Sequence, residues 1–181
     1  MNKKDALLRN AMPLLQWDEQ KYATGFAHID EQHRELFDGL NGLTLFLQNS
    51  LVTDDDENQG KVIELLYFLG EYAMKHFRDE EEIFAQCGHP MALVNKEAHQ
   101  AFFEKFLEYN DNLAHAVFSR DILMQLHIFL NLWLVNHIVK IDTGLRECAG
   151  KPGMETFLQN SRLQARKQGV FSKFLALFAR K

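Results

Sequence analysis

Six side chains spread between residues 33 and 142 have the chemistry to bind a metal ion together. Four are histidines and two are carboxylates, and all lie on or next to apolar helical patterns: His33, His76, Glu80, His99, His137 and Asp142. His76 and Glu80 are four residues apart, so in a helix they leave the same face about one turn apart. His99 stands among the phenylalanines of HQAFFEKF, where a buried helix usually carries an apolar residue.

Imidazole and carboxylate groups inside a helical core need compensation, because an unpaired buried charge is strongly destabilising. A single histidine on an apolar face is usually a core residue with a hydrogen-bond partner. Four histidines with two carboxylates instead indicate one shared metal site. Nitrogen and oxygen ligands without thiolates suit iron, manganese or zinc, and carboxylates that can bridge favour a metal pair. We expect iron, as two ions or as one, with zinc and manganese as alternatives.

His137 and Asp142 are five residues apart, which corresponds to about 140° around an ideal helix. They can therefore reach one centre only if the helix is interrupted between them. A π-type turn or the end of the helix is predicted there.

Four long helices would position these side chains. The first begins at Asp30 as N-cap and ends before the polar loop TDDDENQG, and Gly88 is expected to end the second in a left-handed conformation. Ser119 is expected to cap the fourth helix. The other predicted ranges are about 61 to 86, 90 to 116 and 120 to 143. Long helices joined by short polar loops predict an all-α protein, an up-down-up-down four-helix bundle over residues 30–145.

Two segments flank the predicted bundle. We expect residues 1–29 to form an extended N-terminal arm, because the stretch with Pro13 and Gly25 lacks helical periodicity. Residues 150–181 are predicted to form a basic amphipathic C-terminal helix. Its apolar residues recur at helical spacing at Phe171, Phe174, Leu175 and Phe178. Such a stripe predicts packing on the bundle or on a second copy, and a membrane surface or a partner protein is the alternative.

Composition narrows the class of protein. The 181 residues include only 3 prolines, and 46% are hydrophobic, which fits one helical domain with a substantial core. Residues 1–150 carry 13 Lys and Arg against 24 Asp and Glu, and this acidic body argues against a nucleic-acid partner. Cys87 and Cys148 are far apart in the sequence, so we expect two isolated thiols in a reducing compartment. With no secretory signal or transmembrane segment recognised, the sequence predicts a cytoplasmic protein.

The order of these motifs resembles the hemerythrin family, in particular its bacterial branch. The chain has an arm with Trp17 and Gly25, then IDEQHRELF, HFRDEE, the third-helix histidine and WLVNHIVKID, so the resemblance covers residues 17 to 142. It implies that His33 and His76 bind one iron and that His99 and His137 bind the other. It also implies that Glu80 and Asp142 bridge the two ions.

The chain departs from the family motif HxxxH in the third helix, where it reads NKEAH and Asn95 replaces the first histidine. Asn95 could bind the second iron weakly through its amide oxygen, or hold a water on it, or leave the second iron poorly bound. Trp133 and Val139 occupy positions that line the small-ligand pocket in the family, although ordinary core packing would also explain them.

The resemblance implies a metal-binding protein that takes up dioxygen or a related diatomic ligand for storage, delivery or sensing. We favour such a binding protein over an enzyme. The alternatives are an iron-dependent enzyme that acts on peroxide, dioxygen or nitric oxide at an open coordination position, and an interaction module that has lost its metal. The C-terminal helix is the candidate contact for a homodimer.

Overall fold

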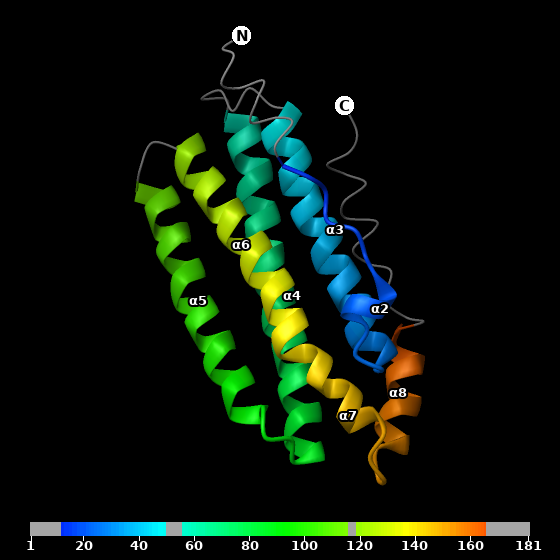
Figure 1. The fold of residues 1–181 in the computed structure, drawn as a ribbon. Helices are drawn as coiled ribbons and strands as arrows, with labels where there is room; N and C mark the ends of the chain where they lie inside the picture. The colour runs from blue at the N-terminus through cyan, green and yellow to red at the C-terminus, as the bar shows by residue number, and fades with distance from the viewer. Residues whose placement is uncertain (1–11, 50–55, 116–118, 166–181) are drawn as a thin grey trace.

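Four long helices form the body of the protein in a computed structural model that describes residues 12–49, 56–115 and 119–165. They are α3 (Ala27–Asn49), α4 (Asp56–Cys87), α5 (Ala92–His115) and α6 (Arg120–Lys140). Each helix packs on the next, and α6 packs back on α3. Figure 1 shows the four helices side by side, with consecutive helices running in opposite directions. The predicted all-α, up-down-up-down bundle is confirmed.

The arm is less extended than the sequence predicts. It contains a single helical turn, α2 (Glu19–Tyr22), which Asp18 caps by accepting hydrogen bonds from the N–H groups of the first turn. The chain then turns at Gly25, whose φ of 88° is unfavourable for other residues, and α3 begins at Ala27. The predicted start at Asp30 is therefore wrong. Asp30 lies inside the first turn and accepts hydrogen bonds from both the N–H and the hydroxyl group of Thr24, at 2.7 Å each.

Of the two other predicted helix-terminating residues, Gly88 at the end of α4 acts as predicted and Ser119 at the start of α6 does not. Gly88 ends α4 in the left-handed conformation, with φ of 62°, as its position predicts. The next N–H group, that of His89, bonds back to the carbonyl of Phe84 at 3.1 Å and closes the helix end. Ser119 stands at the N-cap of α6, but its side chain makes no capping hydrogen bond.

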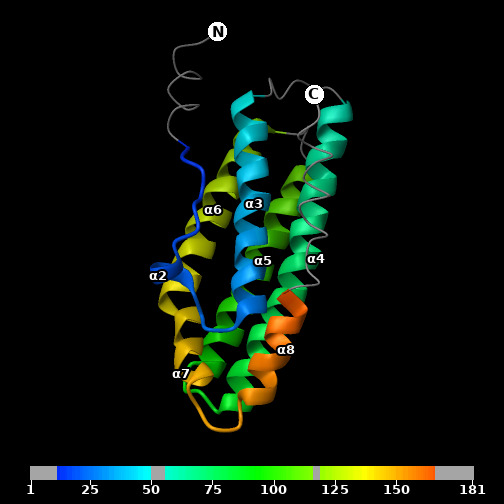
Figure 2. The same cartoon turned by 90° about the vertical axis from the view of Figure 1, so that its right-hand side faces the viewer.

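Beyond α6 the chain folds back along the lower end of the bundle. A 3₁₀ turn, η1 (Asp142–Gly144), leads into α7 (Leu145–Ala149) and then α8 (Glu155–Ala165). α8 packs along α3 (Figure 2), where the hydroxyl of Ser161 accepts a hydrogen bond from the N–H of His28 at 3.1 Å. A C-terminal helix is thus present in the described part of the chain. The predicted stripe of Phe171, Phe174, Leu175 and Phe178 lies outside the described residues.

The prediction of two isolated thiols is wrong, because Cys87 and Cys148 form a disulfide. They are 61 residues apart in the sequence, but α7 folds back onto the C-terminal end of α4 and brings their Cα atoms to 5.5 Å. The bond lies in a small apolar cluster with Phe26, Ile83 and Leu145. It removes the sequence argument for a reducing compartment, on which the expectation of a cytoplasmic location partly rested.

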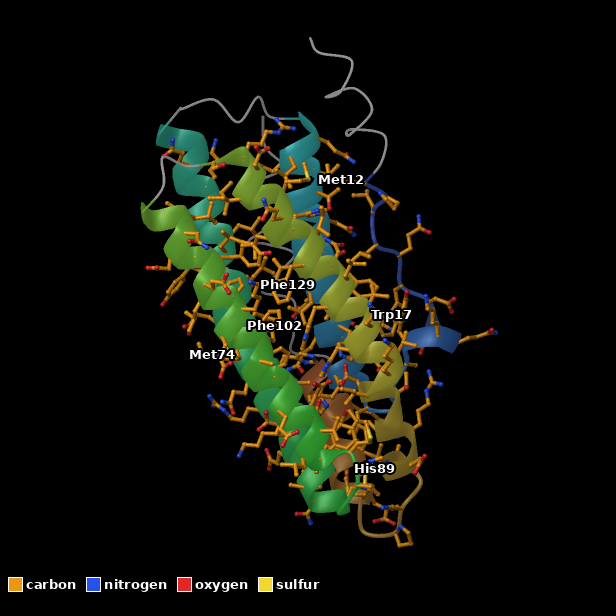
Figure 3. The ribbon with its side chains drawn as sticks, turned by 60° about the vertical axis from the view of Figure 1, so that its left-hand side comes forward. Met12, Trp17, Met74, His89, Phe102 and Phe129 are labelled. Atoms are coloured by element: carbon orange, nitrogen blue, oxygen red, sulfur yellow. A yellow bond between two sulfur atoms is a disulfide. The ribbon has the colours of Figure 1, made fainter. Side chains whose placement is uncertain are left out.

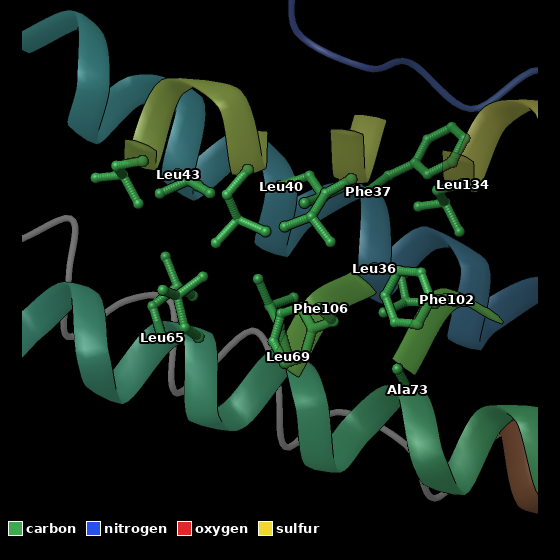
Figure 4. Packing of buried hydrophobic residues seen from close by; sticks show 14 of the residues in the cluster. Leu36, Phe37, Leu40, Leu43, Leu65, Leu69, Ala73, Phe102, Phe106 and Leu134 are labelled. Carbon is green, nitrogen blue, oxygen red and sulfur yellow. The ribbon is translucent and has the colours of Figure 1, made fainter. Parts of the chain in front are cut away.

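The bundle core consists of two apolar layers with a polar layer between them. The larger layer lies toward the middle of the bundle, where leucine and phenylalanine side chains from all four helices meet (Figure 4). The smaller layer lies at the end that α7 and α8 cover. In α3, Ile29 belongs to the smaller layer and Leu36 to the larger one, and His33 lies between them. The predicted metal ligands occupy this level.

One segment of the described chain, Arg120–Ala149, is long and apolar enough to cross a membrane by length and hydropathy alone. It consists of α6, η1 and α7. A core helix of a bundle passes the same test, and α6 is such a helix, because it buries Leu123, Leu126, Leu130 and Leu134 against its neighbours. We therefore interpret it as part of the bundle.

Candidate metal centre

The structure brings all six predicted ligands into one buried layer. His33 comes from α3, His76 and Glu80 from α4, His99 from α5, His137 from α6, and Asp142 from η1. The side chains of His33, Glu80 and Asp142 are 0% exposed, and the other three are at most 5% exposed. Two groups of ligand atoms, each contained within 4.8 Å, share Glu80: one with His33 and His76, the other with His99 and His137.

The two oxygens of Glu80 face different histidines. Its Oε1 lies 3.3 Å from Nε2 of His33 and 3.5 Å from Nε2 of His76, whereas its Oε2 lies 3.3 Å from Nε2 of His99. Two ligand atoms bound to one metal at about 2.1 Å on perpendicular axes are about 3 Å apart. The observed separations are therefore close to those between ligands of a common ion.

Asp142 repeats this arrangement from the other side of the cluster. Its Oδ2 lies 3.5 Å from Nε2 of His33, and its Oδ1 lies 3.1 Å from Nε2 of His137. Each carboxylate thus turns one oxygen toward the His33–His76 pair and the other toward the His99–His137 pair. A carboxylate that bridges two metal ions needs this division of its oxygens.

The direction of Asp142 depends on the end of α6. The helix ends at Lys140, and Ile141 leaves the helical conformation with φ of −123° and ψ of −60°. Asp142 then begins the 3₁₀ turn and points back into the layer. Of the two interruptions that the five-residue spacing predicts, the structure has the helix end rather than the π-type turn.

The residues present fit a bound cation, because the layer leaves ligand atoms without partners. Both carboxylate oxygens of Glu80 and of Asp142, and both ring nitrogens of His33, are buried without a hydrogen bond. Buried polar atoms nearly always have a partner in folded proteins. Two metal ions at this level would give these oxygens and the Nε2 of His33 the partners that the described residues do not provide.

The electrostatics of the layer favour positive charge. Burial opposes protonation of His33, but the carboxylates of Asp142 and Glu80, which lie 3.5 and 3.3 Å from its Nε2, outweigh burial and raise its pKa to about 9. His76 is different: burial dominates there and lowers its pKa to about 3, which leaves a neutral imidazole. Burial would raise the pKa of Glu80, but the neighbouring imidazoles, His76 first among them, hold it well below its usual value. The carboxylates therefore stay ionised and available to a cation.

Two of the imidazoles have defined partners for their second nitrogen. His76 donates from Nδ1 to Oε1 of Gln32 at 3.0 Å, and Nε2 of Gln32 donates to Asp79 at 2.6 Å. His99 donates from Nδ1 directly to the carboxylate of Glu81 at 2.9 Å. Hydrogen bonds of this kind fix which nitrogen faces a metal. Gln32 and Glu81 could not be singled out from the sequence, because polar residues beside a predicted ligand resemble the solvated face of a helix.

Asn95 is fully buried on α5, one turn before His99, and neither its amide oxygen nor its amide nitrogen has a hydrogen-bond partner. An amide in this state is destabilising unless a ligand or a water contacts it. Asn95 is thus a predicted site residue whose amide makes no hydrogen bond to the described residues.

The remaining histidines whose side chains are described have partners outside this layer. His28 bonds to Ser161, His89 lies 3.3 Å from a carboxylate oxygen of Glu147 at the lower end (Figure 3), and His127 bonds to Thr44. The side chain of His115 lies outside the described residues. None of the three described histidines is placed to substitute for the histidine that Asn95 replaces.

The two predicted pocket residues are placed differently. Trp133 stacks on His137 with ring centroids 4.3 Å apart, and it lines an apolar cavity of about 30 Å³. Val139 is 39% exposed and does not line this cavity. Most of the cavity wall consists of side chains that converge in Figure 4, among them Leu36, Leu69, Ala73, Phe102 and Leu134.

The comparison with known families agrees with this geometry. A family model described as the hemerythrin HHE cation binding domain matches residues 24–149. The chain belongs to the hemerythrin family. The resemblance found in the sequence is thereby confirmed, and the match spans all four bundle helices, η1 and α7.

Hemerythrins from distant organisms are similar to this chain. A bacteriohemerythrin of Stenotrophomonas maltophilia is 31% identical over 127 residues, which are 70% of this chain and 76% of that protein. The hemerythrin subunit alpha of Lingula anatina is 30% identical over 126 residues, 70% of this chain and 87% of that protein. A crystal structure of a hemerythrin point mutant has a TM-score of 0.60 and 25% identity, and covers 77% of this chain and 100% of that one.

Proposed function

We propose that this hemerythrin binds a pair of iron ions in the polar layer, and dioxygen or a related diatomic ligand there, for storage, delivery or sensing. The observation that carries the proposal is the division of carboxylate oxygens between two imidazole pairs. His33 and His76 would hold one ion and His99 and His137 the other, with Glu80 and Asp142 shared. When bound, ferrous iron supplies the electrons and the open coordination position that an electron-accepting gas needs.

The open position would belong to the ion of His99 and His137. Asn95 lies on the same face of α5 as His99, four residues earlier, and it offers an amide oxygen rather than an imidazole. A neutral amide oxygen is a weaker donor to iron than imidazole. Its N–H₂ group, which has no partner among the residues that the structure describes, can donate a hydrogen bond to a water or to a bound gas.

The apolar cavity adjoins this half of the site. Trp133 and Phe77 line it, and they stack on His137 and on His99 respectively, with ring centroids 4.3 and 3.8 Å apart. A volume of about 30 Å³ exceeds the minimum of roughly 10–15 Å³ for one water-sized molecule. Because its lining is apolar, the cavity favours a nonpolar diatomic molecule over water.

The arm shields the opposite half of the site from solvent. The Trp17 ring lies 6.2 Å from the ring of His33 in a stacked arrangement and packs edge-on against Phe37. Arg34 lies over the same indole at 4.6 Å from the ring centroid and pairs with Glu19 at 2.9 Å. These contacts hold the arm over α3, so water would have little access to the ion of His33 and His76.

Anaerobic loading with ferrous iron tests the proposal. We expect two irons per chain, and on admission of air a new charge-transfer absorption in the visible region that fades when the gas is removed. The matched variants are Glu80→Gln, which removes a shared carboxylate, and His89→Gln, which changes a buried histidine outside the layer. Glu80→Gln should lose the pair and the absorption, and His89→Gln should keep both. One iron or none in the unmodified protein, or no absorption change in air, would contradict the proposal.

A further inference from the structure

The residues that accept a hydrogen bond from the second ring nitrogen differ between His76 and His99. His99 lies on the same helix as Asn95. Behind His76 stands the neutral amide of Gln32. Behind His99 stands a carboxylate, Glu81, whose Oε1 lies 2.9 Å from Nδ1 of the imidazole. The resemblance to the family implies metal-binding roles for His76 and Glu80 in α4 but none for Glu81, which directly follows Glu80.

His99 is held between two consecutive acidic residues. Its Nε2 faces Oε2 of Glu80 at 3.3 Å, while its Nδ1 bonds to Glu81 on the outer side. The ring also stacks on Phe77, with centroids 3.8 Å apart and planes 4° from parallel. The face of the ring is thus fixed by Phe77 and its rotation by Glu81, so that Nε2 is the nitrogen presented to a metal.

We infer that Glu81 is a positioning residue that strengthens His99 as a metal ligand and so compensates for the missing imidazole at Asn95. A carboxylate that accepts the Nδ1–H bond draws the proton toward itself and makes the opposite nitrogen a stronger donor. A neutral amide, such as that of Gln32, does this less. The side chain of Glu81 is 32% exposed, so water still solvates its carboxylate and the desolvation penalty for its charge is reduced. The inference rests on the proposed metal pair.

The compensation is local, because Asn95 and His99 would serve the same ion. They lie one turn apart on one face of α5, and Glu81 reaches His99 from the neighbouring helix α4. Asn95 would be a weak donor to this ion and His99 a strengthened one. Together they would keep the affinity of the site for this ion closer to that of a site with three imidazoles. The first ion, held by His33 and His76, does not depend on Glu81.

Cobalt(II) titration of the full-length protein without oxygen tests this inference, because the visible bands of bound cobalt report the strength of each ligand. Glu81→Gln keeps a hydrogen-bond acceptor but removes the charge. Glu82→Gln is the matched control, since it removes the same charge from the next, exposed residue. We expect Glu81→Gln to weaken the second cobalt equivalent by about 10–100-fold and to shift its visible bands, with the first equivalent unchanged. Glu82→Gln should match the unmodified protein.

A double variant tests compensation itself. If Glu81 offsets the missing imidazole, Glu81→Gln should cost less affinity in an Asn95→His background than alone. Equal weakening of both equivalents by Glu81→Gln, or no band shift, would indicate a merely structural contact and overturn the inference while the metal pair stands. Failure of the unmodified protein and of Glu82→Gln to bind a second equivalent would overturn the pair, and the inference with it.

Discussion

Oδ1 of Asp142 lies 3.1 Å from Nε2 of His137 because α6 ends between the two residues. A continued helix would point the carboxylate about 140° away from the imidazole. The break at Ile141 therefore determines whether the layer has one carboxylate or two.

Asp142→Asn tests the second carboxylate. The variant keeps the size of the side chain but removes the charge, so we expect loss of at least one iron per chain after anaerobic loading. Metal analysis of the desalted protein measures the ratio. Thr143→Ala is the control, because it changes the same turn and removes only a hydrogen bond to the carbonyl of Val139. An unchanged ratio in Asp142→Asn would mean that Asp142 is not a ligand.

Asn95→Leu should make the metal-free protein more stable. The buried amide has no hydrogen-bond partner, so replacing it by an apolar side chain of similar size removes a desolvation cost of about 1–3 kcal/mol. Urea unfolding in the presence of a chelator measures the change. A fall in the unfolding free energy would show that the amide has a partner in solution.

Asn95→His should tighten binding of the second iron and slow autoxidation, because it supplies the imidazole that the third-helix motif of the family contains. Stopped-flow absorbance after oxygen addition measures the oxidation rate, and chelator competition measures the affinity. Unchanged values for both would mean that Asn95 does not contact the metal.

Reduction of the Cys87–Cys148 disulfide should destabilise the protein substantially. The bond closes a loop with a separation of 61 residues, for which the chain-entropy estimate is about 4 kcal/mol. For a domain of this size we expect the midpoint of thermal unfolding to fall by on the order of 10 °C in a phosphine reductant. A Cys87→Ser, Cys148→Ala double variant should show the lower midpoint with and without reductant.

His127 should make stability depend on pH below neutrality. Its Nε2 bonds to Thr44 at 2.6 Å, its Nδ1 is buried without a partner, and burial lowers its pKa to about 4. The unfolded chain, with a pKa near 6.5, binds the proton more tightly. The contribution of neutral His127 is therefore complete above about pH 6.5 and is lost as the pH falls toward 4, by up to about 3 kcal/mol.

Chemical unfolding of the metal-free protein between pH 4 and pH 7 measures this dependence, and His127→Gln isolates it. The difference in stability between the unmodified protein and the variant should change in favour of the variant as the pH falls. A constant difference would indicate that His127 does not titrate on unfolding.

The convergence of five of the six predicted ligands could be predicted because each lies on a helix whose apolar pattern fixes its inward face; they are His33, His76, Glu80, His99 and His137. His33 between Ile29 and Leu36 illustrates this, since helical periodicity alone points all three inward. The interruption before Asp142 was predictable from its spacing to His137, although the form of the interruption was not. Helix ends were less predictable: the start of α3 depends on the turn at Gly25 and on Thr24 binding Asp30.

Two features could not be predicted from the sequence and are visible only in the folded chain, namely the disulfide and the contact of Glu81 with His99. The disulfide depends on α7 folding back to α4 after a short 3₁₀ turn, and nothing in the spacing of Cys87 and Cys148 indicates this. The hydrogen bond between Glu81 and His99 depends on which side of α4 faces α5. In the sequence, Glu81 is only one residue in a run of acidic residues. Both depend on contacts between helices, which local sequence patterns do not specify.

The disulfide also affects the chain when it is unfolded. Cys87 follows Glu80 by seven residues and Cys148 follows Asp142 by six. An oxidised chain that loses its helices therefore keeps the two carboxylates proposed to be shared, Glu80 and Asp142, joined through a short covalent path. Tethered groups at such distances meet at millimolar effective concentration. The disulfide thus keeps these two carboxylates near each other while the bundle re-forms.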